Sequence, residues 1–415
     1  MKEQIIAGLE NPQRLEALYR EDKSEFKRAF STIYPAIQDD KTAQIWNERL
    51  NFEGSEFSWG ATKDLPFVLA LCFGAGLIAK IPQLTSIDSE RFYPRNIGFI
   101  IFPFLIAFFV WKQRAYHLRT IVGLALAILI PAVYINVLPG NDKTDTFQLA
   151  CIHVPILLWG ILSYAFAGER YRDYSKRIDF LRYNGDLAVM TGLILIAGVI
   201  MTAMTINLFS MIGVRIEDIY FKYVGIWGLS SAPIIATYLV QSNPNLVGKV
   251  SPVIARIFTP LVLVMLVIYL GTVVYTGKDP YTDRDFLLLF NGLLIAVMAL
   301  ILFYVIEIAR KGAGKIETVI LFALASVTIV VNGIALSAIL FRIASWGITP
   351  NRLAVMGSNV LILVHLLIVT YQLYKTMGTA ERMESVKKSI TTFLPIYLIW
   401  TIIVIFAFPY FFGFK

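Results

Sequence analysis

Residues 316–340 read IETVILFALASVTIVVNGIALSAIL, residues 341–352 read FRIASWGITPNR, and residues 353–374 read LAVMGSNVLILVHLLIVTYQLY. The first and third stretches are almost entirely apolar, and each reaches the roughly 20 residues that an α-helix needs to cross the hydrocarbon core of a bilayer. The pattern therefore predicts two transmembrane helices joined by a short polar loop.

The same pattern recurs along the chain. Of the 415 residues, 57% are hydrophobic and 16% charged, and the mean hydropathy is +0.66, whereas soluble domains are about one quarter charged. We expect an all-α, polytopic integral membrane protein with about eleven transmembrane helices. The expected spans are residues 65–82, 96–111, 120–138, 147–167, 187–212, 223–240, 257–275, 286–308, 316–340, 353–374 and 392–412.

The first 63 residues differ from the rest, because they are polar and lack the apolar core of a signal peptide. Asn11 and Pro12 are typical of a helix start, and Leu15, Leu18 and Phe26 then follow at helical spacing. We expect residues 1–63 to form a cytosolic amphipathic helical segment and residues 64–415 the transmembrane domain. Two helices this small cannot bury a core alone, so they should dock on the membrane domain. Alternatively, residues 11–50 bind a cytosolic protein partner.

Loop charges predict the orientation. With the N-terminus inside, the inner loops hold the larger share of the loop lysines and arginines, as the positive-inside rule requires. The C-terminus is then outside. This rule also explains the net charge of +8 without a basic face for nucleic acid, which we do not expect as a partner.

The loop at residues 341–352 is an exception, because it carries two arginines and no acid on the predicted outer side. Thr349 and Pro350 predict a helix start, where free N–H groups attract anions. Arginine adds bidentate geometry for carboxylate or phosphate. The candidate outer anion site comprises Arg342, Trp346, Thr349, Asn351 and Arg352.

Two structural explanations of this loop remain open. Trp346 and the arginines are typical of interfacial anchors at headgroup level. The arginines could also pair with an acid of a nearby loop, namely Asp279, Asp283 or Asp285.

Residues 168–186 predict an inner surface helix whose acids pair with bases three or four residues later. Asn184-Gly185 should then turn the chain, and Asp186 should cap the fifth span.

Ionisable groups are nearly absent from the spans, although ion-coupled carriers usually keep some there. The candidate cavity-lining residues are His153, Ser358, Asn359 and His365. A weaker candidate is a serine-protease dyad of Ser230 with His153 or His365. The sequence predicts no metal site, no cofactor and no established catalytic residue.

Three segments carry a family resemblance: Arg-Ile-x-x-Trp-Gly-Ile-Thr-x-x-Arg at residues 342–352, Asn-Pro-x-x-Leu-Glu-x-Leu-Tyr-Arg at residues 11–20, and Arg-Tyr-Arg-Asp-Tyr at residues 170–174. The chain resembles the bacterial membrane family catalogued as "domain of unknown function 4153". This resemblance implies a multi-pass protein of the bacterial inner (cytoplasmic) membrane and no particular substrate, cofactor or site residue.

We expect a permease-like or flippase-like protein that handles an anionic envelope component: a lipid, a glycan or a small anion. The first alternative is a non-catalytic membrane sensor or scaffold whose N-terminal helices bind a cytosolic partner. The second is an intramembrane hydrolase. A permease should have a wet cavity near His365, a scaffold should expose part of the Leu15, Leu18 and Phe26 stripe, and a hydrolase should place Ser230 beside a histidine.

Overall fold

The computed structural model describes residues 2–21, 23–51, 64–113, 117–139, 144–276, 281, 284–311, 314–376 and 383–414. Within these ranges every regular element is a helix. The chain divides into two compact units, Met1–Ser58 and Trp59–Lys415.

The first unit consists of four short helices, α1 (Lys2–Ala7), α2 (Pro12–Glu21), α3 (Lys23–Ile37) and α4 (Lys41–Asn51). The predicted helix start is confirmed, because α2 begins at Pro12 and the backbone N–H of Arg14 donates to Asn11 Oδ1 over 3.2 Å. Asp40 caps α4 in the same way, accepting from the backbone N–H of Ala43 over 2.9 Å. Such caps satisfy N–H groups that the first helical turn leaves free.

The first unit has a hydrophobic core of its own. Leu15 and Phe26 are fully buried, and they pack with Phe30 and Trp46 inside the unit. The prediction that these helices cannot bury a core was therefore wrong, because four helices enclose the stripe rather than two. Leu15 and Phe26 of the predicted stripe face this core, and Leu18 packs against it while staying partly exposed.

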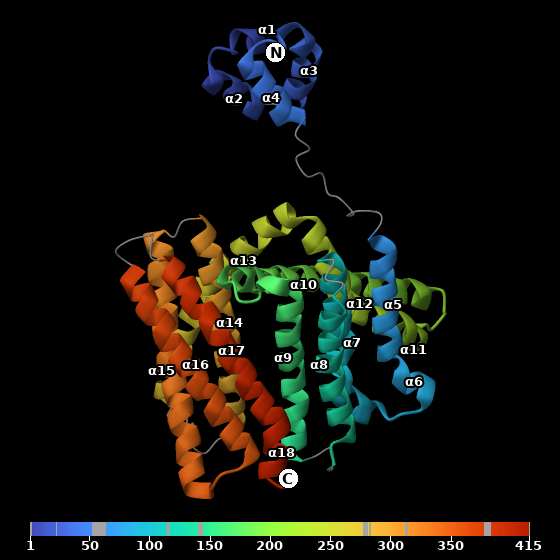
Figure 1. Ribbon diagram of the computed structural model, residues 1–415, viewed down its shortest axis with the longest axis vertical. Helices are drawn as coiled ribbons and strands as arrows, with labels where there is room; N and C mark the ends of the chain where they lie inside the picture. The colour runs from blue at the N-terminus through green and yellow to red at the C-terminus, as the bar shows by residue number, and fades with distance from the viewer. Residues whose placement is uncertain are drawn as a thin grey trace. The chain divides into compact units, whose positions relative to one another are not determined.

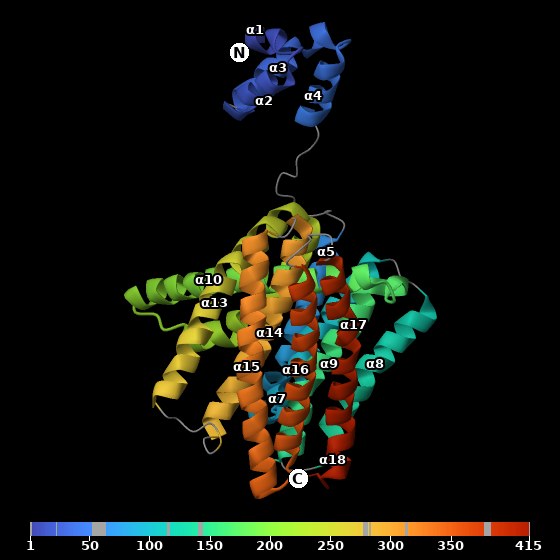
Figure 2. The ribbon, with the colours of Figure 1, turned by 90° about the vertical axis from the view of Figure 1, so that its left-hand side faces the viewer.

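The second unit is a helical bundle (Figures 1 and 2). Its helices are α5 (Leu65–Ala79), α6 (Ile81–Thr85), α7 (Ser89–Lys112), α8 (Leu118–Val137), α9 (Asp145–Ala167), α10 (Tyr174–Met211), α11 (Glu217–Tyr220), α12 (Ile226–Ser242), α13 (Pro244–Thr276), α14 (Arg284–Lys311), α15 (Lys315–Trp346), α16 (Pro350–Thr376), α17 (Met383–Ile402) and α18 (Phe408–Phe411). A 3₁₀ turn (Gly168–Arg170) precedes α10, and π-helical turns join α11 to α12 and α17 to α18.

Each predicted span is helical. Among the described residues, ten helices are long and apolar enough to cross a membrane, so the protein is a multi-pass membrane protein in contact with lipid. The remaining predicted span is α5, which has only 15 residues and a length of about 22 Å, below the roughly 30 Å of a hydrocarbon core. A break at Lys80 separates α5 from α6, where Pro82 lies in the first turn.

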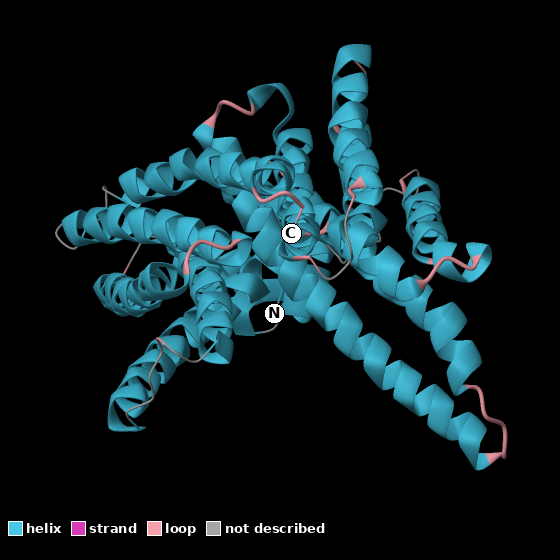
Figure 3. Ribbon diagram, turned by 90° about the horizontal axis from the view of Figure 1, so that it is seen from below, coloured by secondary structure: helices cyan, strands magenta, loops and turns pink. Residues whose placement is uncertain are grey.

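Helix α10 departs most from expectation. It runs unbroken through 38 residues, so the predicted turn at Asn184-Gly185 and cap at Asp186 were wrong. Gly185 instead allows close packing, since a Cβ there would overlap the ring of Phe303 on α14. Figures 1 and 3 show that α10 lies crosswise to the long axes of α9, α15 and α16, and its apolar C-terminal half projects sideways. The most apolar stretch of α10 buries none of its residues.

The N-terminal half of α10 passes between two groups of helices. One apolar cluster draws on α5, α7, α9 and α12, and the other on α13 to α17. Phe180 and Tyr183 of α10 belong to the first cluster, whereas Leu181 packs against the second. The segment predicted to be a self-paired surface helix therefore joins the two halves of the bundle.

The two ends of the bundle are distinct. Figure 1 shows that α5 starts at one end, whereas the α15–α16 connection and the C-terminus lie at the other. The end at which α5 starts also holds the ends of α7, α9 and α14 (Figure 1). We call it the first end, and the end with the C-terminus the second end.

Candidate functional site

The loop at residues 341–352 lies at the second end and satisfies its own charges in part. The backbone N–H of Arg352 donates to Thr349 Oγ1 over 3.3 Å, so Thr349 caps α16 as predicted. The guanidinium of Arg352 donates to the carbonyls of Trp346 and Gly347, over 2.8 and 2.7 Å. These carbonyls end α15, where the helix dipole is negative. Arg352 lies in the first turn of α16, where the helix dipole disfavours a positive charge. The carbonyls at the end of α15 offset this effect by accepting its hydrogen bonds.

Trp346 brings the two arginines together. Its ring lies 5.0 Å from the guanidinium carbon of Arg342 and 5.7 Å from that of Arg352, and it is half exposed. Cation–π contacts of this kind stabilise the loop without a ligand. Asp279, Asp283 and the side chain of Asp285, the acids considered as partners, lie outside the described residues. The outer anion site stays a prediction.

Asn359 and Ser358, two of the predicted cavity-lining residues, make hydrogen bonds to neighbouring helices. Asn359 Nδ2 donates to Asn291 Oδ1 over 2.9 Å, and its backbone carbonyl accepts from Asn332 Nδ2 over 3.2 Å. Trp400 Nε1 donates to Ser358 Oγ over 3.2 Å. These amides connect α14, α15 and α16, which is how polar residues commonly join helices in membranes.

His365 has no solvent-accessible surface. Its ring stacks on Phe393 at 4.5 Å, and Nδ1 lies 3.1 Å from the hydroxyl of Tyr397. His153 bonds instead to the carbonyl of Leu149 within its own helix, over 2.8 Å. His365 is thus surrounded by protein, and the structure does not join it to His153. None of the described pockets is lined by His365, so the wet cavity expected there for a permease is not found among the described residues.

Ser230 has a local partner as well. Its hydroxyl donates to the carbonyl of Trp227 on the same helix, α12, over 3.1 Å. Among the described hydrogen bonds, none joins Ser230 to either histidine. The described residues also contain no cluster of three or more His, Cys, Asp or Glu side chains that could hold a metal.

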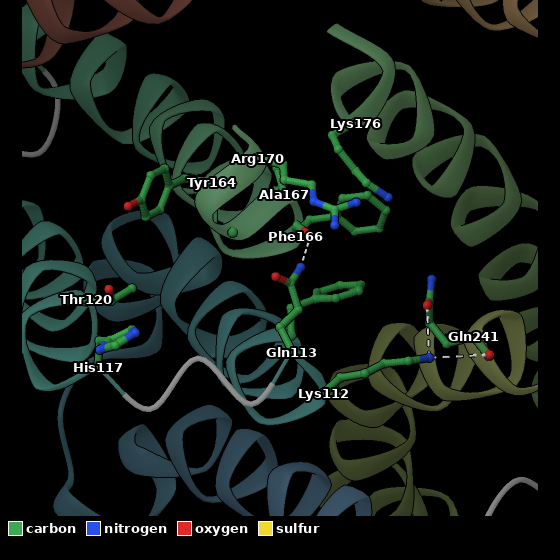
Figure 4. Close-up of a pocket in the computed structure, with 12 residues that line it drawn as sticks. Lys112, Gln113, His117, Thr120, Tyr164, Phe166, Ala167, Arg170, Lys176 and Gln241 are labelled. Carbon is green, nitrogen blue, oxygen red and sulfur yellow. Dashed lines mark hydrogen bonds between the residues drawn. The ribbon is translucent and has the colours of Figure 1, made fainter. Parts of the chain in front are cut away.

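A pocket that the sequence did not reveal opens at the first end of the bundle. It has a volume of about 650 Å³ and combines basic, amide and aromatic side chains (Figure 4). Its described lining residues include no Asp or Glu; they are Phe109, Lys112, Gln113, His117, Thr120, Tyr164, Phe166, Ala167, Gly168, Arg170, Lys176 and Gln241. We call it the basic pocket.

The last residues of α7 hold the pocket together. Lys112 Nζ donates to the side-chain and backbone oxygens of Gln241, over 3.0 and 3.4 Å. The Gln113 amide donates to the carbonyl of Phe166 (Figure 4). Gln241 and Phe166 lie at the C-terminal ends of α12 and α9, whose last carbonyls lack partners within their own helices. These bonds fix the mouth of the pocket.

The opposite side of the pocket can accept an anion. His117 precedes α8 and makes no side-chain capping hydrogen bond there, although its carbonyl accepts from the backbone N–H of Thr120 over 2.9 Å. The first two N–H groups of α8 precede Thr120 and are the groups that an anion could reach. Thr120 adds a hydroxyl to this side. In Figure 4 the side chains of Arg170 and Lys176 extend toward each other, and Gln113 lies between them and the pair of His117 and Thr120. Hydrogen-bond donors and positively charged side chains therefore line the same pocket.

Nearby acids only partly balance this charge. Asp179 lies 3.5 Å from Lys176 but is shared with Arg182, at 3.8 Å. Asp173 caps α10 by accepting from the backbone N–H of Ser175 over 2.9 Å, which holds the pKa of Asp173 below its usual range. It therefore stays ionised near neutral pH, and neither acid is among the described lining residues.

The sequence contained one clue to this pocket. Residues 168–186 hold five basic residues, and the predicted acid–base pairs use Arg172, Arg177 and Arg182. The two remaining bases are Arg170 and Lys176, and both line the pocket. The contribution of α7, α8 and α12 could not be seen, because their residues lie far away in the chain.

One cation lies inside the bundle rather than in a loop. Arg95 immediately precedes the expected span 96–111, but it is buried in α7 with 5% of its surface exposed. It lies 4.5 Å from the ring of Phe147 and donates to the carbonyl of Asn136 near the end of α8, over 3.5 Å. Arg95 therefore joins helices rather than contributing charge to a loop.

Comparison with family models, with curated proteins and with solved structures found no match for this chain.

Proposed function

We propose that this protein is permease-like or flippase-like and handles an anionic envelope component, which it binds in the basic pocket through a phosphate or carboxylate group. The observation that carries the proposal is that Lys112, Arg170 and Lys176 line one pocket whose opposite side is formed by the start of α8, where His117 makes no side-chain capping hydrogen bond. Guanidinium groups and helix N-termini both bind such anions well. We further propose, from the motifs at residues 11–20, 170–174 and 342–352, that the chain is related to the family of unknown function and lies in a bacterial inner membrane.

Binding is tested with the purified full-length protein in nanodiscs, using phosphatidylglycerol against phosphatidylcholine and inorganic phosphate as a competitor. The double variant Arg170→Gln/Lys176→Gln should lose at least about tenfold in affinity, since charged hydrogen bonds contribute about 1.5–3 kcal/mol. The comparison variant, Arg342→Gln/Arg352→Gln, alters two cations at the other end. Binding like that of the parent supports the basic pocket, whereas a loss of binding in this variant alone supports the predicted outer anion site. Equal binding by the parent and the pocket variant would contradict the proposal.

Movement is tested separately, by reconstituting the protein in vesicles with a fluorescent phosphatidylglycerol and measuring how fast the label crosses the bilayer. The parent should speed the crossing, and the pocket variant should not. Headgroup binding without movement would reject the permease and flippase readings.

A second candidate, a sensor or scaffold, is favoured by the separate core of the first unit. A unit with its own core can present a surface independently. Ile6 and Ile45 are exposed on it, at 50% and 67%. Photo-crosslinkers at these two positions in cells should capture one protein repeatedly, and a crosslinker at Glu10 should not. Capture that is the same at all three positions would count against this candidate.

A further inference from the structure

A second pocket, formed by apolar side chains, lies where α10 crosses the bundle. It has a volume of about 520 Å³ and is lined from α9, α10, α13, α14 and α17. We call it the crossing groove. It shares no described lining residue with the basic pocket, so the two pockets can be occupied independently.

The polar side chains of the groove satisfy each other. Trp159 Nε1 donates to Asn184 Oδ1 over 2.9 Å, and Asn184 Nδ2 donates to the carbonyl of Phe180 over 2.6 Å. An occupant of the groove therefore needs no hydrogen-bonding group. Apolar cavities also do not hold water, which requires polar partners.

The helices that line the groove indicate which apolar molecule could occupy it. Each described lining residue of the groove belongs to a helix long and apolar enough to span a membrane. Ala188 and Ala299 are exposed rather than packed, although they line the groove. Small exposed side chains on two crossing helices leave a channel that is open to the hydrocarbon core.

Charges lie at one rim of the groove. Phe303 lines it, and Glu307, one helical turn nearer the end of α14, lies 3.5 Å from Arg182 of α10. Ala255 lines it too, and the next residue, Arg256, lies 2.6 Å from Glu317 of α15. An apolar groove with ion pairs at one end matches a lipid, whose chain is apolar and whose headgroup is polar.

We propose that the crossing groove binds one acyl chain of a membrane phospholipid, with the headgroup at the rim formed by the Arg182–Glu307 and Arg256–Glu317 pairs. The chain fills the space that α10 leaves by crossing α13 and α14 instead of running beside them. It thereby supports the crosswise position of α10. The bound lipid is a structural ligand, distinct from any lipid that the protein moves.

The test uses the full-length protein in nanodiscs containing a phosphatidylcholine with a photoactivatable diazirine near the end of one acyl chain. Mass spectrometry then locates the labelled peptides. The parent should label residues 254–258 and 299–303 several-fold more than the apolar residues 196–201 of α10, which are all exposed and line none of the described pockets.

Two substitutions fill the groove, Ala188→Trp on α10 and Ala299→Trp on α14. Each should reduce labelling of residues 254–258 several-fold. The matched controls are Ala197→Trp and Ala296→Trp, which lie on the same two helices, are also exposed and are not among the described lining residues of the groove. They should leave the labelling unchanged.

Even labelling of the groove and of residues 196–201 in the parent would overturn the proposal, and this result does not depend on whether the variants fold. Labelling that persists in both groove-filled variants would overturn it too. Neither result bears on the affinity of the basic pocket for headgroups, so the two proposals fail separately.

Discussion

The guanidinium of Arg182 on α10 lies 3.5 Å from the carboxylate of Glu307 on α14, and Glu307 is 97% buried with 3% of its surface exposed. This pair fixes the level at which α10 crosses the bundle. Gly185 contacts Phe303 one turn away, and Arg177 donates to the carbonyl of Thr391 on α17 over 3.0 Å. The crossing therefore combines an ion pair, a close approach and a hydrogen bond.

Breaking the ion pair should destabilise the bundle. Arg182→Ala leaves the buried carboxylate without its cation, which should cost about 1–3 kcal/mol, less than the 3–5 kcal/mol of fully buried pairs, because Arg182 is partly exposed. Glu307→Gln should cost less, since the remaining cation can reach water and Asp179. Thermal unfolding of both variants in nanodiscs measures the difference. A larger loss for Glu307→Gln would contradict this ranking.

Gly185 should not tolerate a side chain. Gly185→Ala forces a Cβ against Phe303 and should lower stability by about 1–3 kcal/mol, despite the better helix propensity of alanine. Phe303→Leu in the same protein should restore part of the loss. The control is Gly192→Ala on the same helix, where a Cβ meets open space and stability should rise by up to about 1 kcal/mol. Thermal unfolding again measures both.

Arg352 should stabilise the α15–α16 turn. Arg352→Ala removes two hydrogen bonds to the end of α15 and should lower stability by about 1 kcal/mol, since both groups are exposed and water competes. Thermal unfolding measures the loss, and phosphatidylglycerol binding measured in parallel should not change. A variant that unfolds normally but loses lipid binding would instead support the outer anion site.

The first unit should lose stability in acid. Glu16 accepts from Arg20 over 2.9 Å and lies 2.8 Å from Arg49, and these hydrogen bonds lower its pKa from the ordinary 4.5. A lowered folded-state pKa stabilises the fold above the unfolded-state value, and this stabilisation is lost as pH falls through the folded-state pKa. Hydrogen exchange of residues 12–51 should therefore show less acid-dependent opening in Glu16→Gln, which lacks the titrating group. Glu48→Gln, on the exposed side of α4, should behave as the parent does.

The sequence alone determined the membrane class, the positions of the apolar helices, and the caps at Asn11 and Thr349. These features are local: the length of an apolar run decides whether it can span a bilayer, and a cap requires residues within one turn. The tertiary structure decided the rest. The basic pocket depends on the hydrogen bond from Lys112 to Gln241, which lies 129 residues away in the chain. The crossing of α10 depends on the hydrogen bond from Arg177 to Thr391, which lies 214 residues away. Residues 168–186 suit a surface helix equally well by local pairing, and only the packing of Gly185 on Phe303 places them inside the bundle.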